Sequence, residues 1–273
     1  MLTIGWFSTG RDEAARQLLQ VVQNEISKGN IEANIAFVFS NREPGESSES
    51  DLFFQLVNSY KIPLICFSSA RFKTVQKAAT SIEKGTLSQW RLEYDREIMQ
   101  RLDRFKVDLC VLAGYMLIVG KEMCHKYDMI NLHPAVPDGP KGSWQQVIWT
   151  LIQEKAKESG VMMHLVTPDL DRGPVITYCV FPITGEPFDK HWKAITNCSM
   201  NEIKKEEGEA NSLFQLIRQH GLVREFPLIV STLTAFSQGR VKIKNGKVLF
   251  DSQDKPISGY NLSYNVNKAI GIT

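Results

Sequence analysis

The segment DLCVLAGYMLIVGKEMCHKYDMINLHP, residues 108–134, carries the pattern that decides the fold. It contains two mostly apolar runs, Asp108–Ala113 and Met129–Leu132. Such blocks are typical of strands buried on both faces of a parallel sheet, because a strand with one solvent face alternates polar and apolar residues. The second run leads into HPAVPDGPKG, whose prolines and glycines indicate a loop. The segment therefore predicts two buried strands, the second of which ends in a loop.

Outward from this segment, apolar β-rich runs alternate with amphipathic helical stretches. The other expected strands are Leu2–Phe7, Ile35–Phe39, Leu64–Phe67, Val161–Val166 and Val175–Ile183. The expected helices are Asp12–Ser27, Asp51–Tyr60, Gln89–Phe105, Ser143–Glu154 and Phe214–Ser237. Near residues 240–251, the dipeptide Asn245-Gly246 predicts a hairpin that joins Val241–Ile243 to Val248–Phe250.

This alternation predicts an α/β fold, with an open, mostly parallel twisted sheet and helices on both faces. In such sheets the functional site lies at the carboxyl ends of the strands. The loops concerned follow Phe7, Phe39, Ala113, Leu132 and Val166. We expect residues 1–273 to form a single domain, with a polar insert or excursion near residues 185–212.

The composition argues against several classes of protein. The 273 residues include 32 Lys and Arg and 30 Asp and Glu, a net charge of +2, so no nucleic-acid footprint is expected. Neither a signal peptide nor an apolar run of membrane-spanning length is present, so no membrane contact is expected. The five cysteines are scattered without a C-x-x-C pair, which argues against a zinc site. We expect a cytoplasmic protein, monomer or homodimer, that acts on small molecules.

Two segments carry residues suited to acid–base chemistry. Asn131-Leu132-His133-Pro134 closes a strand, and side-chain alternation puts Asn131 and His133 on the same side. An amide can donate to an oxyanion, and an imidazole can exchange a proton near neutral pH. Farther along, His164–Pro174 ends a strand in a loop that includes Asp171, a carboxylate that could lie against His133. Taken alone, the first segment also fits a strand end with an interior histidine, and the second fits a β-turn.

Together, in this order and spacing, the two segments resemble the folate-dependent formyltransferases. That family carries an N-x-H-P loop, here Asn131–Pro134, and then an H-[FY]-V-x-x-x-L-D-x-G-P loop, here His164–Pro174. The resemblance covers nearly the whole chain except 185–212 and parts of loops. Further stretches similar to the family are Phe37–Asn41, Glu93–Glu97, Val111–Met116, Phe226–Val230 and Gly239–Lys242.

The resemblance implies formyl transfer from 10-formyltetrahydrofolate, a co-substrate, to an amine, with no metal. It implies that Asn131 and protonated His133 stabilise the oxyanion, while Asp171 holds His133 in its cationic form and helps to relay a proton. His164 is expected to brace the loop that carries Asp171. The resemblance also implies two groups of binding residues. The folate carrier is expected to contact Arg91, through its glutamate tail, and Met116, Leu117, Ile118, Val119, Val166, Thr167, Asp169 and Leu170. The acceptor is expected to contact Ser8, Thr9, Gly10, Arg11 and Pro134.

The resemblance is greatest to family members whose acceptor is 5'-phosphoribosylglycinamide, an intermediate of purine biosynthesis. The acceptor side nevertheless departs from the family pattern. Asp12 and Glu13 bring negative charge to the start of the first helix, where the family binds a phosphate. Leu222 stands where the family has a carboxylate that contacts the acceptor, and Glu225 is expected to be out of phase with that position.

Several alternatives follow from these departures. The acceptor could be another amine, such as that of an amino-sugar nucleotide, or water, which would make the protein a formyltetrahydrofolate hydrolase. A non-catalytic folate-binding protein is a further alternative, although it would not need Asn131, His133 and Asp171 together. A dinucleotide-dependent dehydrogenase is not expected, since no G-x-G-x-x-G follows the first strand.

Overall fold

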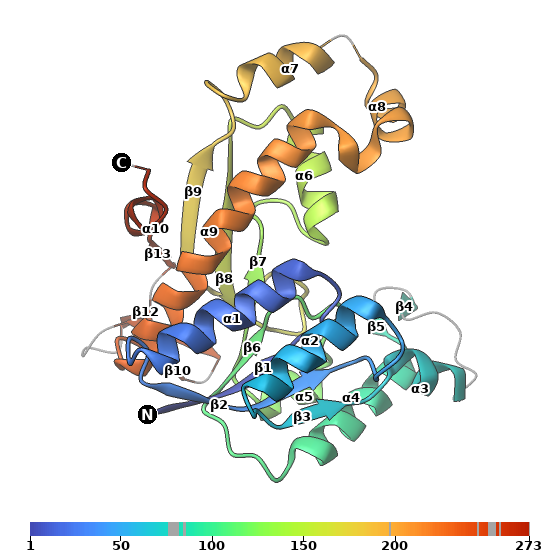
Figure 1. Cartoon of the computed structure of the whole chain (residues 1–273), viewed down its shortest axis with the longest axis vertical. Helices are drawn as coiled ribbons and strands as arrows, with labels where there is room; N and C mark the ends of the chain where they lie inside the picture. The colour runs from blue at the N-terminus through green and yellow to red at the C-terminus, as the bar shows by residue number, and fades with distance from the viewer. Residues whose placement is uncertain are drawn as a thin grey trace.

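The computed structural model describes residues 1–75, 82–83, 86–196, 198–244, 246–250, 255–256 and 258–272. Its main feature is an eight-stranded sheet with the strand order β13-β9-β8-β7-β6-β1-β2-β3. Helices pack on both faces of this sheet (Figure 1). The structure thus confirms the open, mostly parallel α/β architecture expected from the sequence.

The first half of the chain forms the parallel part of the sheet. Its strands are β1 (Leu2–Phe7), β2 (Ala33–Ser40), β3 (Leu64–Cys66), β6 (Leu109–Leu112) and β7 (Met129–His133). The helices between them are α1 (Glu13–Ser27), α2 (Ser48–Ser59), α3 (Ser69–Val75), α4 (Gln89–Leu102) and α5 (Lys121–Lys126). A short pair of strands, β4 (Ile82–Glu83) and β5 (Thr86–Leu87), precedes α4. The sequence pattern missed α3 and α5, which are too short to show a clear helical period.

The second half of the sheet changes direction. Strand β8 (Glu158–Leu165) runs antiparallel both to β7 and to β9 (Val175–Pro182), and β13 (Tyr260–Asn261) pairs in parallel with β9. The register places Leu165 opposite Ile130, so β8 ends at the amino end of β7. We expected the loop after Val166 to lie at the edge of the sheet where the parallel strands have their carboxyl ends. The start of this loop lies at the opposite edge, beside the amino end of β7, so the expectation is wrong for that part of the loop. An apolar run shows that a strand is buried but not which way it points.

The polar stretch near residues 185–212 forms short helices in its described part, namely α7 (Asp189–Ile195), α8 (Met200–Glu206) and the 3₁₀ turn η1 (Gly208–Ala210). Phe188 is buried, and with the partly buried Trp192 it packs into the apolar cluster around α6 (Trp144–Gln153) and α9 (Ser212–Ser237). Helix α9 begins earlier than its apolar pattern suggests, because the Asn211 side chain accepts hydrogen bonds from the backbone N–H groups of Leu213 and Phe214.

The C-terminal region packs onto the same body. The expected hairpin is present as β10 (Val241–Lys244) paired with β11 (Lys247–Phe250), while Asn245 lies outside the described residues. It continues into β12 (Lys255–Pro256), and α10 (Ser263–Ala269) follows β13. Buried side chains from the hairpin and from α10, Val241, Val248 and Val266, belong to the main apolar cluster.

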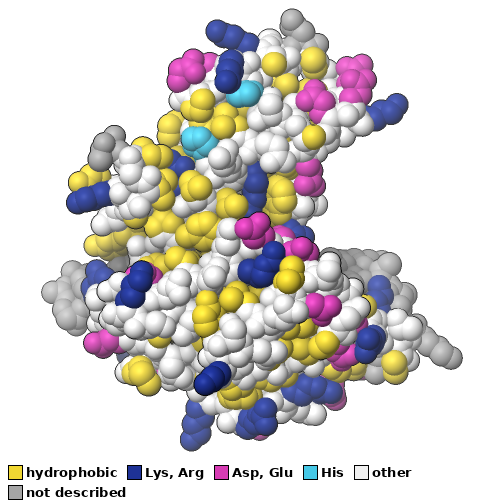
Figure 2. Space-filling view, in the orientation of Figure 1, with side chains coloured by type: hydrophobic (Ala, Val, Ile, Leu, Met, Phe, Trp, Pro, Cys, Tyr) yellow, Lys and Arg dark blue, Asp and Glu magenta, His cyan; other side chains and the backbone are white. Residues whose placement is uncertain are grey.

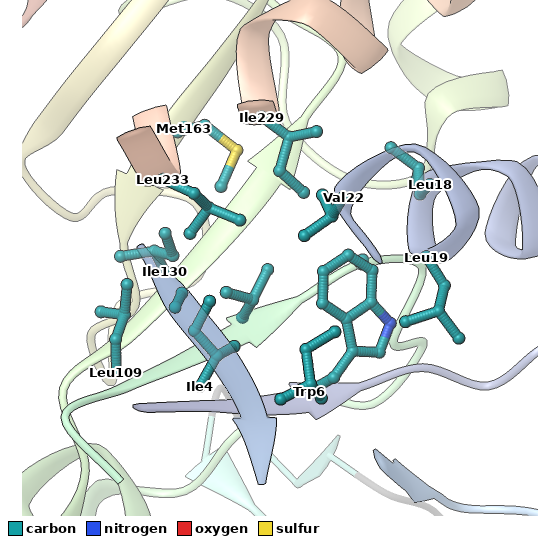
Figure 3. Packing of buried hydrophobic residues seen from close by; sticks show 14 of the residues in the cluster. Ile4, Trp6, Leu18, Leu19, Val22, Leu109, Ile130, Met163, Ile229 and Leu233 are labelled. Atoms are coloured by element: carbon teal, nitrogen blue, oxygen red, sulfur yellow. The ribbon is translucent and has the colours of Figure 1, made fainter. Parts of the chain in front are cut away.

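The core that positions the site lies between the sheet and the helices α1 and α9. Figure 3 shows Ile4 and Trp6 of β1 packed against Leu19 and Val22 of α1 and Ile229 of α9. On the opposite face of the sheet, α4 and α5 cover a second cluster that includes Phe7, Phe37, Tyr94 and Met123. Among the described residues, none of the helices is both long and apolar enough to cross a membrane.

Candidate active site

A cavity of about 350 Å³ opens where β6 and β7 end. It lies between the start of α1, the start of α6, the middle of α9 and the loop after β8. Most of the expected site residues line it, which are Arg11, Met116, Leu117, Ile118, Val119, Asn131, His133, Pro134, Val166, Thr167, Leu170 and Asp171. Two segments more than thirty residues apart in the sequence therefore contribute their chemical groups to one space.

Strand β7 supplies the amide and the imidazole. Asn131 lies between two neighbours in the sheet, with Leu112 of β6 on one side and His164 of β8 on the other. Asn131 and His133 both line the cavity, while Ile130 belongs to the apolar core. The alternation of side chains along β7 thus brings the two polar groups together, as expected.

Asp171 reaches the cavity because the loop after β8 folds back along the strand. The backbone N–H of Leu165 donates to the carbonyl of Pro174 over 2.9 Å, which closes the loop at its base. Gly173 makes this closure possible, since a Cβ atom there would lie 1.7 Å from the carbonyl oxygen of Leu165. Asp171 adopts a left-handed backbone conformation, with φ of 51°, that turns its side chain toward β7.

The carboxylate of Asp171 connects three segments. Its Oδ2 accepts a hydrogen bond from the backbone N–H of Gly142 over 3.2 Å and lies 3.9 Å from Nδ1 of His133. Its Oδ1 lies 3.6 Å from Nε2 of His164. Burial raises the pKa of Asp171, but His164, His133 and the Gly142 N–H outweigh it and leave the pKa below its ordinary value. Asp171 is therefore a carboxylate at neutral pH.

His164 lies beside the other two groups, in agreement with its expected bracing position. Its Nδ1 is 2.9 Å from the backbone carbonyl of Leu165, so this nitrogen carries the proton and donates. Its Nε2 lies 3.2 Å from the side-chain nitrogen of Asn131 and 3.6 Å from Oδ1 of Asp171, so it accepts from Asn131 when the ring is neutral and donates to Asp171 when the ring is protonated. This contact orients the NH₂ group of Asn131 and leaves its second hydrogen for another acceptor.

His133 is only 3% exposed, and its electrostatics differ from the expectation. Its Nε2 lies 3.0 Å from the carbonyl of Pro140 and donates to it, which leaves Nδ1 facing Asp171. Burial lowers the pKa of His133 below 6.5, even though the Pro140 carbonyl and the charge of Asp171 favour the protonated form. In this structure the ring is therefore neutral at neutral pH rather than cationic, because desolvation outweighs its partners.

The carrier side of the cavity is built from backbone and apolar groups at residues 115–119. The Met116 N–H donates to the hydroxyl of Thr9 over 3.0 Å, and the Ile118 carbonyl accepts from Arg91 over 2.6 Å. In the described part of the chain, the backbone N–H and carbonyl of Leu117 have no hydrogen-bond partner. The backbone N–H and carbonyl of Leu117 thus suit hydrogen bonds to the ring of a folate carrier. Asp169 is exposed and does not line the cavity.

Arg91 is buried and does not line the cavity, although it was expected to contact the folate tail. Its side chain is 2% exposed and forms an ion pair with Asp95 over 3.0 Å. Burial beneath the loop directs its Nη2 to the carbonyl of Ile118, and Arg91 is not among the residues that line the cavity. The expected contact with the folate tail is replaced by a structural one, in which Arg91 holds the backbone of the 116–119 loop.

The first loop of the chain is also directed inward. Ser8 is fully buried, and Thr9 is 2% exposed, with its hydroxyl donating to Asn41 over 2.7 Å. Gly10 has a φ of 62°, and its Cα faces the ring of Phe53. None of these three lines the cavity, whereas Arg11 does. The hydroxyl groups of Ser8 and Thr9 were expected to bind an acceptor. They instead form hydrogen bonds within the protein, where β1 and β2 pack closely together.

Asp12 occupies the amino end of α1. Its Oδ1 accepts a hydrogen bond from the Ala15 N–H over 3.0 Å, and its Oδ2 lies 3.4 Å from Nε of Arg11. The helix start, which could otherwise bind a phosphate, is thus capped by the protein's own carboxylate.

Three further residues line the acceptor end of the cavity, of which Trp144 and Arg218 were not named in the sequence analysis and Glu225 was named but set aside. Trp144 at the start of α6 lines the cavity, and the guanidinium of Arg218 lies 4.7 Å from its ring centre. Nη1 of Arg218 pairs with Oε1 of Glu225 over 2.6 Å, and both residues line the cavity. The expectation that Glu225 is out of phase with the acceptor position is wrong, because Glu225 lines the cavity and Leu222 does not. The seven-residue spacing of Arg218 and Glu225, about two turns of a helix, is the feature of the sequence that could have indicated this pair.

Known proteins of one family are similar to this chain. A family model described as formyl transferase matches residues 13–191, which is well over half of the chain. The chain belongs to the formyl transferase family. It is therefore an enzyme of the transferase class. Within the described residues, no group of three or more His, Cys, Asp and Glu could hold a metal ion.

Named members of the formyl transferase family are similar over much of the chain. The phosphoribosylglycinamide formyltransferase of Haemophilus influenzae is 25% identical over 246 residues, which cover 89% of this chain and 92% of that protein. The enzyme of the same name from Escherichia coli is 27% identical over 170 residues, which cover 61% of this chain and 67% of that protein.

Solved structures show the same fold at lower identity. The phosphoribosylglycinamide formyltransferase from Coxiella burnetii has a TM-score of 0.66 at 22% identity, and covers 95% of this chain and 98% of its own. A formyltetrahydrofolate deformylase from Pseudomonas syringae has a TM-score of 0.59 at 19% identity, and covers 91% of this chain and 65% of its own. These similarities concern the formyltransferase fold.

Proposed function

We propose that this formyltransferase moves the formyl group of 10-formyltetrahydrofolate to the amine of 5'-phosphoribosylglycinamide, a step of purine biosynthesis. The observation that carries the proposal is the convergence of Asn131, His133 and Asp171 on one cavity. The names of the relatives support the choice of acceptor, since the Haemophilus enzyme matches most of the chain.

The residues have distinct roles in this reaction. The acceptor nitrogen forms a bond to the formyl carbon, the bond from that carbon to the folate nitrogen breaks, and one proton moves from the acceptor nitrogen to the folate nitrogen. The free N–H of the Asn131 amide donates to the formyl oxygen as negative charge develops on it. Neutral His133 takes up the proton from the acceptor amine and passes it on. Asp171 stabilises the imidazolium formed in between, because its carboxylate lies 3.9 Å from Nδ1.

The hydrogen bond from His133 to Pro140 has a consequence for this cycle. One ring nitrogen donates to the Pro140 carbonyl and the other faces Asp171, so both are engaged within the protein. Before His133 can accept a proton at Nε2, its ring proton must move to Nδ1, where Asp171 accepts the hydrogen bond, and the bond to Pro140 must be exchanged for one to the substrate.

The acceptor end offers groups for an amine and an anion. Glu225 is 6% exposed and provides a carboxylate that can accept a hydrogen bond from the amine, while Arg11 provides a cationic group for a phosphate. Asp12 opposes a phosphate at the start of α1. A phosphorylated acceptor must therefore place its phosphate near Arg11 against the charge of Asp12, which lies 3.4 Å from Nε of Arg11.

A test of the proposal is to incubate the protein with 10-formyltetrahydrofolate and 5'-phosphoribosylglycinamide, each alone and both together. Turnover that requires both compounds is the expected result. Loss of the formyl group in water alone would identify a deformylase instead. That second candidate is favoured by Asp12, which caps α1 and removes the phosphate site that water does not need.

The variant Asp12→Ser separates the two candidates further. Serine can retain the cap of α1 without the negative charge. For a phosphorylated acceptor we expect the KM to fall by about two- to fivefold, in line with the ~0.3–1 kcal/mol of a charge at a helix end. Hydrolysis of formyl-folate by a deformylase would be unchanged by the same substitution.

A further inference from the structure

A second cavity, of about 740 Å³, lies on the other side of α9 from the catalytic cavity. We call it the rear groove. It is formed by α1, α9 and the chain around α10, and its lining residues include Val21, Glu25, Val223, Arg224, Ile270 and Ile272. Among the described residues, none lines both the rear groove and the catalytic cavity.

Most of the wall of the rear groove is apolar. Val223 is 38% exposed and Ile272 is 44% exposed, although both are large apolar side chains. Figure 2 shows hydrophobic side chains gathered on the surface between α1 and the region of α9 and α10. A cavity of this size is within the range that binds small organic molecules, which gain affinity by covering such surface.

One cation lies in this apolar setting. Arg224 is 3% exposed, its Nε donates to the side-chain oxygen of Asn267 over 3.1 Å, and its Nη1 donates to the carbonyl of His220 over 2.7 Å. Its guanidinium lies 4.4 Å from the centre of the Phe181 ring. All of these partners are neutral, and among the described residues no carboxylate forms an ion pair with Arg224.

The other titratable groups of the rear groove do not neutralise this charge. Glu25 stands at the rim, where Lys28 donates to its Oε1 over 2.7 Å and Asn30 donates to its Oε2 over 2.6 Å. His220 has a pKa below its ordinary value, because burial and the charge of Arg224 both disfavour its protonation. A buried cation with only neutral partners lacks the counter-charge that such groups usually have.

We propose that the rear groove binds an amphipathic carboxylate, a single-chain organic acid with its carboxylate toward Arg224 and its chain along Val21, Val223 and Ile270. The charge of Arg224 selects the anionic head, and the apolar wall selects the chain. This site is separate from the formyl-transfer reaction and does not depend on the acceptor proposed above.

Calorimetric titration of the full chain with decanoate, decanol and decyltrimethylammonium tests the choice of ligand. We expect decanoate to bind with one equivalent per chain, and both other probes to bind at least tenfold more weakly. Equal affinity for decanoate and decanol would overturn the proposal, since it would mean that Arg224 does not contribute. Tighter binding of decyltrimethylammonium would do the same.

A pair of variants at one exposed position tests the location. Val223→Glu places a carboxylate beside Arg224, whereas Val223→Lys adds a long side chain of the opposite charge. We expect Val223→Glu to weaken decanoate binding at least tenfold and Val223→Lys to keep it within about threefold of the parent chain. Equal affinities in the two variants, or loss in both with unchanged circular dichroism, would overturn the proposal.

Two controls separate this site from the catalytic cavity and from self-association. Saturating 10-formyltetrahydrofolate should not displace decanoate, and His133→Ala should bind it as the parent chain does. Displacement would place the acid in the catalytic cavity and refute the proposal while leaving the formyl-transfer function intact. Sedimentation that shows a dimer, dissociated by Val223→Glu and without decanoate binding, would assign the rear groove to a second copy and also refute it.

Discussion

His133 is a buried imidazole whose two nitrogens face a carbonyl and a carboxylate. Its position was predictable, since an N-x-H-P segment at the end of an apolar strand indicates where the side chain emerges. Its charge was not predictable, because the pKa of a histidine depends on desolvation by segments that are distant in the sequence. Arg91 illustrates the same limit, since nothing on its own helix shows that it lies beneath the 116–119 loop.

The substitution His133→Ala tests the proton-transfer role of this residue. We expect kcat to fall roughly 10²- to 10⁴-fold, the usual contribution of a general acid–base group, while the affinity for 10-formyltetrahydrofolate changes little. The matched control is His125→Ala, since His125 is exposed on α5 away from the cavity. Steady-state kinetics and folate titration measure the two quantities. Undiminished turnover of His133→Ala would remove this residue from the mechanism.

The pH profile reports the electrostatics of the same residue. Burial lowers the pKa of His133 below 6.5, so kcat/KM should fall on the acid side only below about that pH, as the neutral base is lost. The charge of Asp171 raises the pKa of His133, so Asp171→Asn should lower it further. We expect the acid limb of the residual activity to move to lower pH in this variant. A shift to higher pH would contradict the assigned role of Asp171.

At the scale of elements, the loop after β8 is the feature on which the site depends most. The return of this loop to β7 requires that Gly173 approach the carbonyl of Leu165. A Gly-Pro dipeptide in the sequence indicates a turn, but it does not indicate that the strand before it is antiparallel to β7. That direction follows from the pairing of β7 with β8.

The substitution Gly173→Ala should separate Asp171 from its partners. An added methyl group would overlap the Leu165 carbonyl, so the loop must move and activity should fall at least tenfold. The control is Gly221→Ala in α9, where the nearest atom to the new methyl group is 3.9 Å away. That change should stabilise the protein by about 0.5–1 kcal/mol. Full activity of Gly173→Ala, measured beside the control, would show that the loop does not need this close approach.

At the scale of the whole molecule, one apolar cluster joins segments from both ends of the chain. It includes Ile4 and Trp6 near the amino end with Ile229 and Leu233 on α9 (Figure 3). Val266 on α10 belongs to the same cluster. A shared core of this kind supports the prediction that residues 1–273 form a single domain, because its parts cannot separate without exposing the same surface to water.

This arrangement predicts a single cooperative unfolding transition for the chain. The substitution Ile229→Ala should lower the free energy of unfolding by about 2–5 kcal/mol and shift the whole transition, since it leaves a cavity in the shared core. Leu52→Ala is the matched control, because Leu52 is 45% exposed and its removal should change stability by less than about 0.5 kcal/mol. Calorimetry that resolves two transitions, only one of them shifted by Ile229→Ala, would divide the chain into two domains.

The sequence by itself determined the class of fold and the main strands and helices, which follow from local periodicity. Its resemblance to the formyltransferases predicts Asn131, His133 and Asp171 as a catalytic set, and these residues line one cavity in the structure. Only the tertiary structure decided the direction of β8, the burial of Arg91, the neutral state of His133 and the presence of Glu225 at the cavity. Each of these depends on contacts between segments far apart in the sequence, and the burial and electrostatic energies of such contacts arise only when the chain is packed.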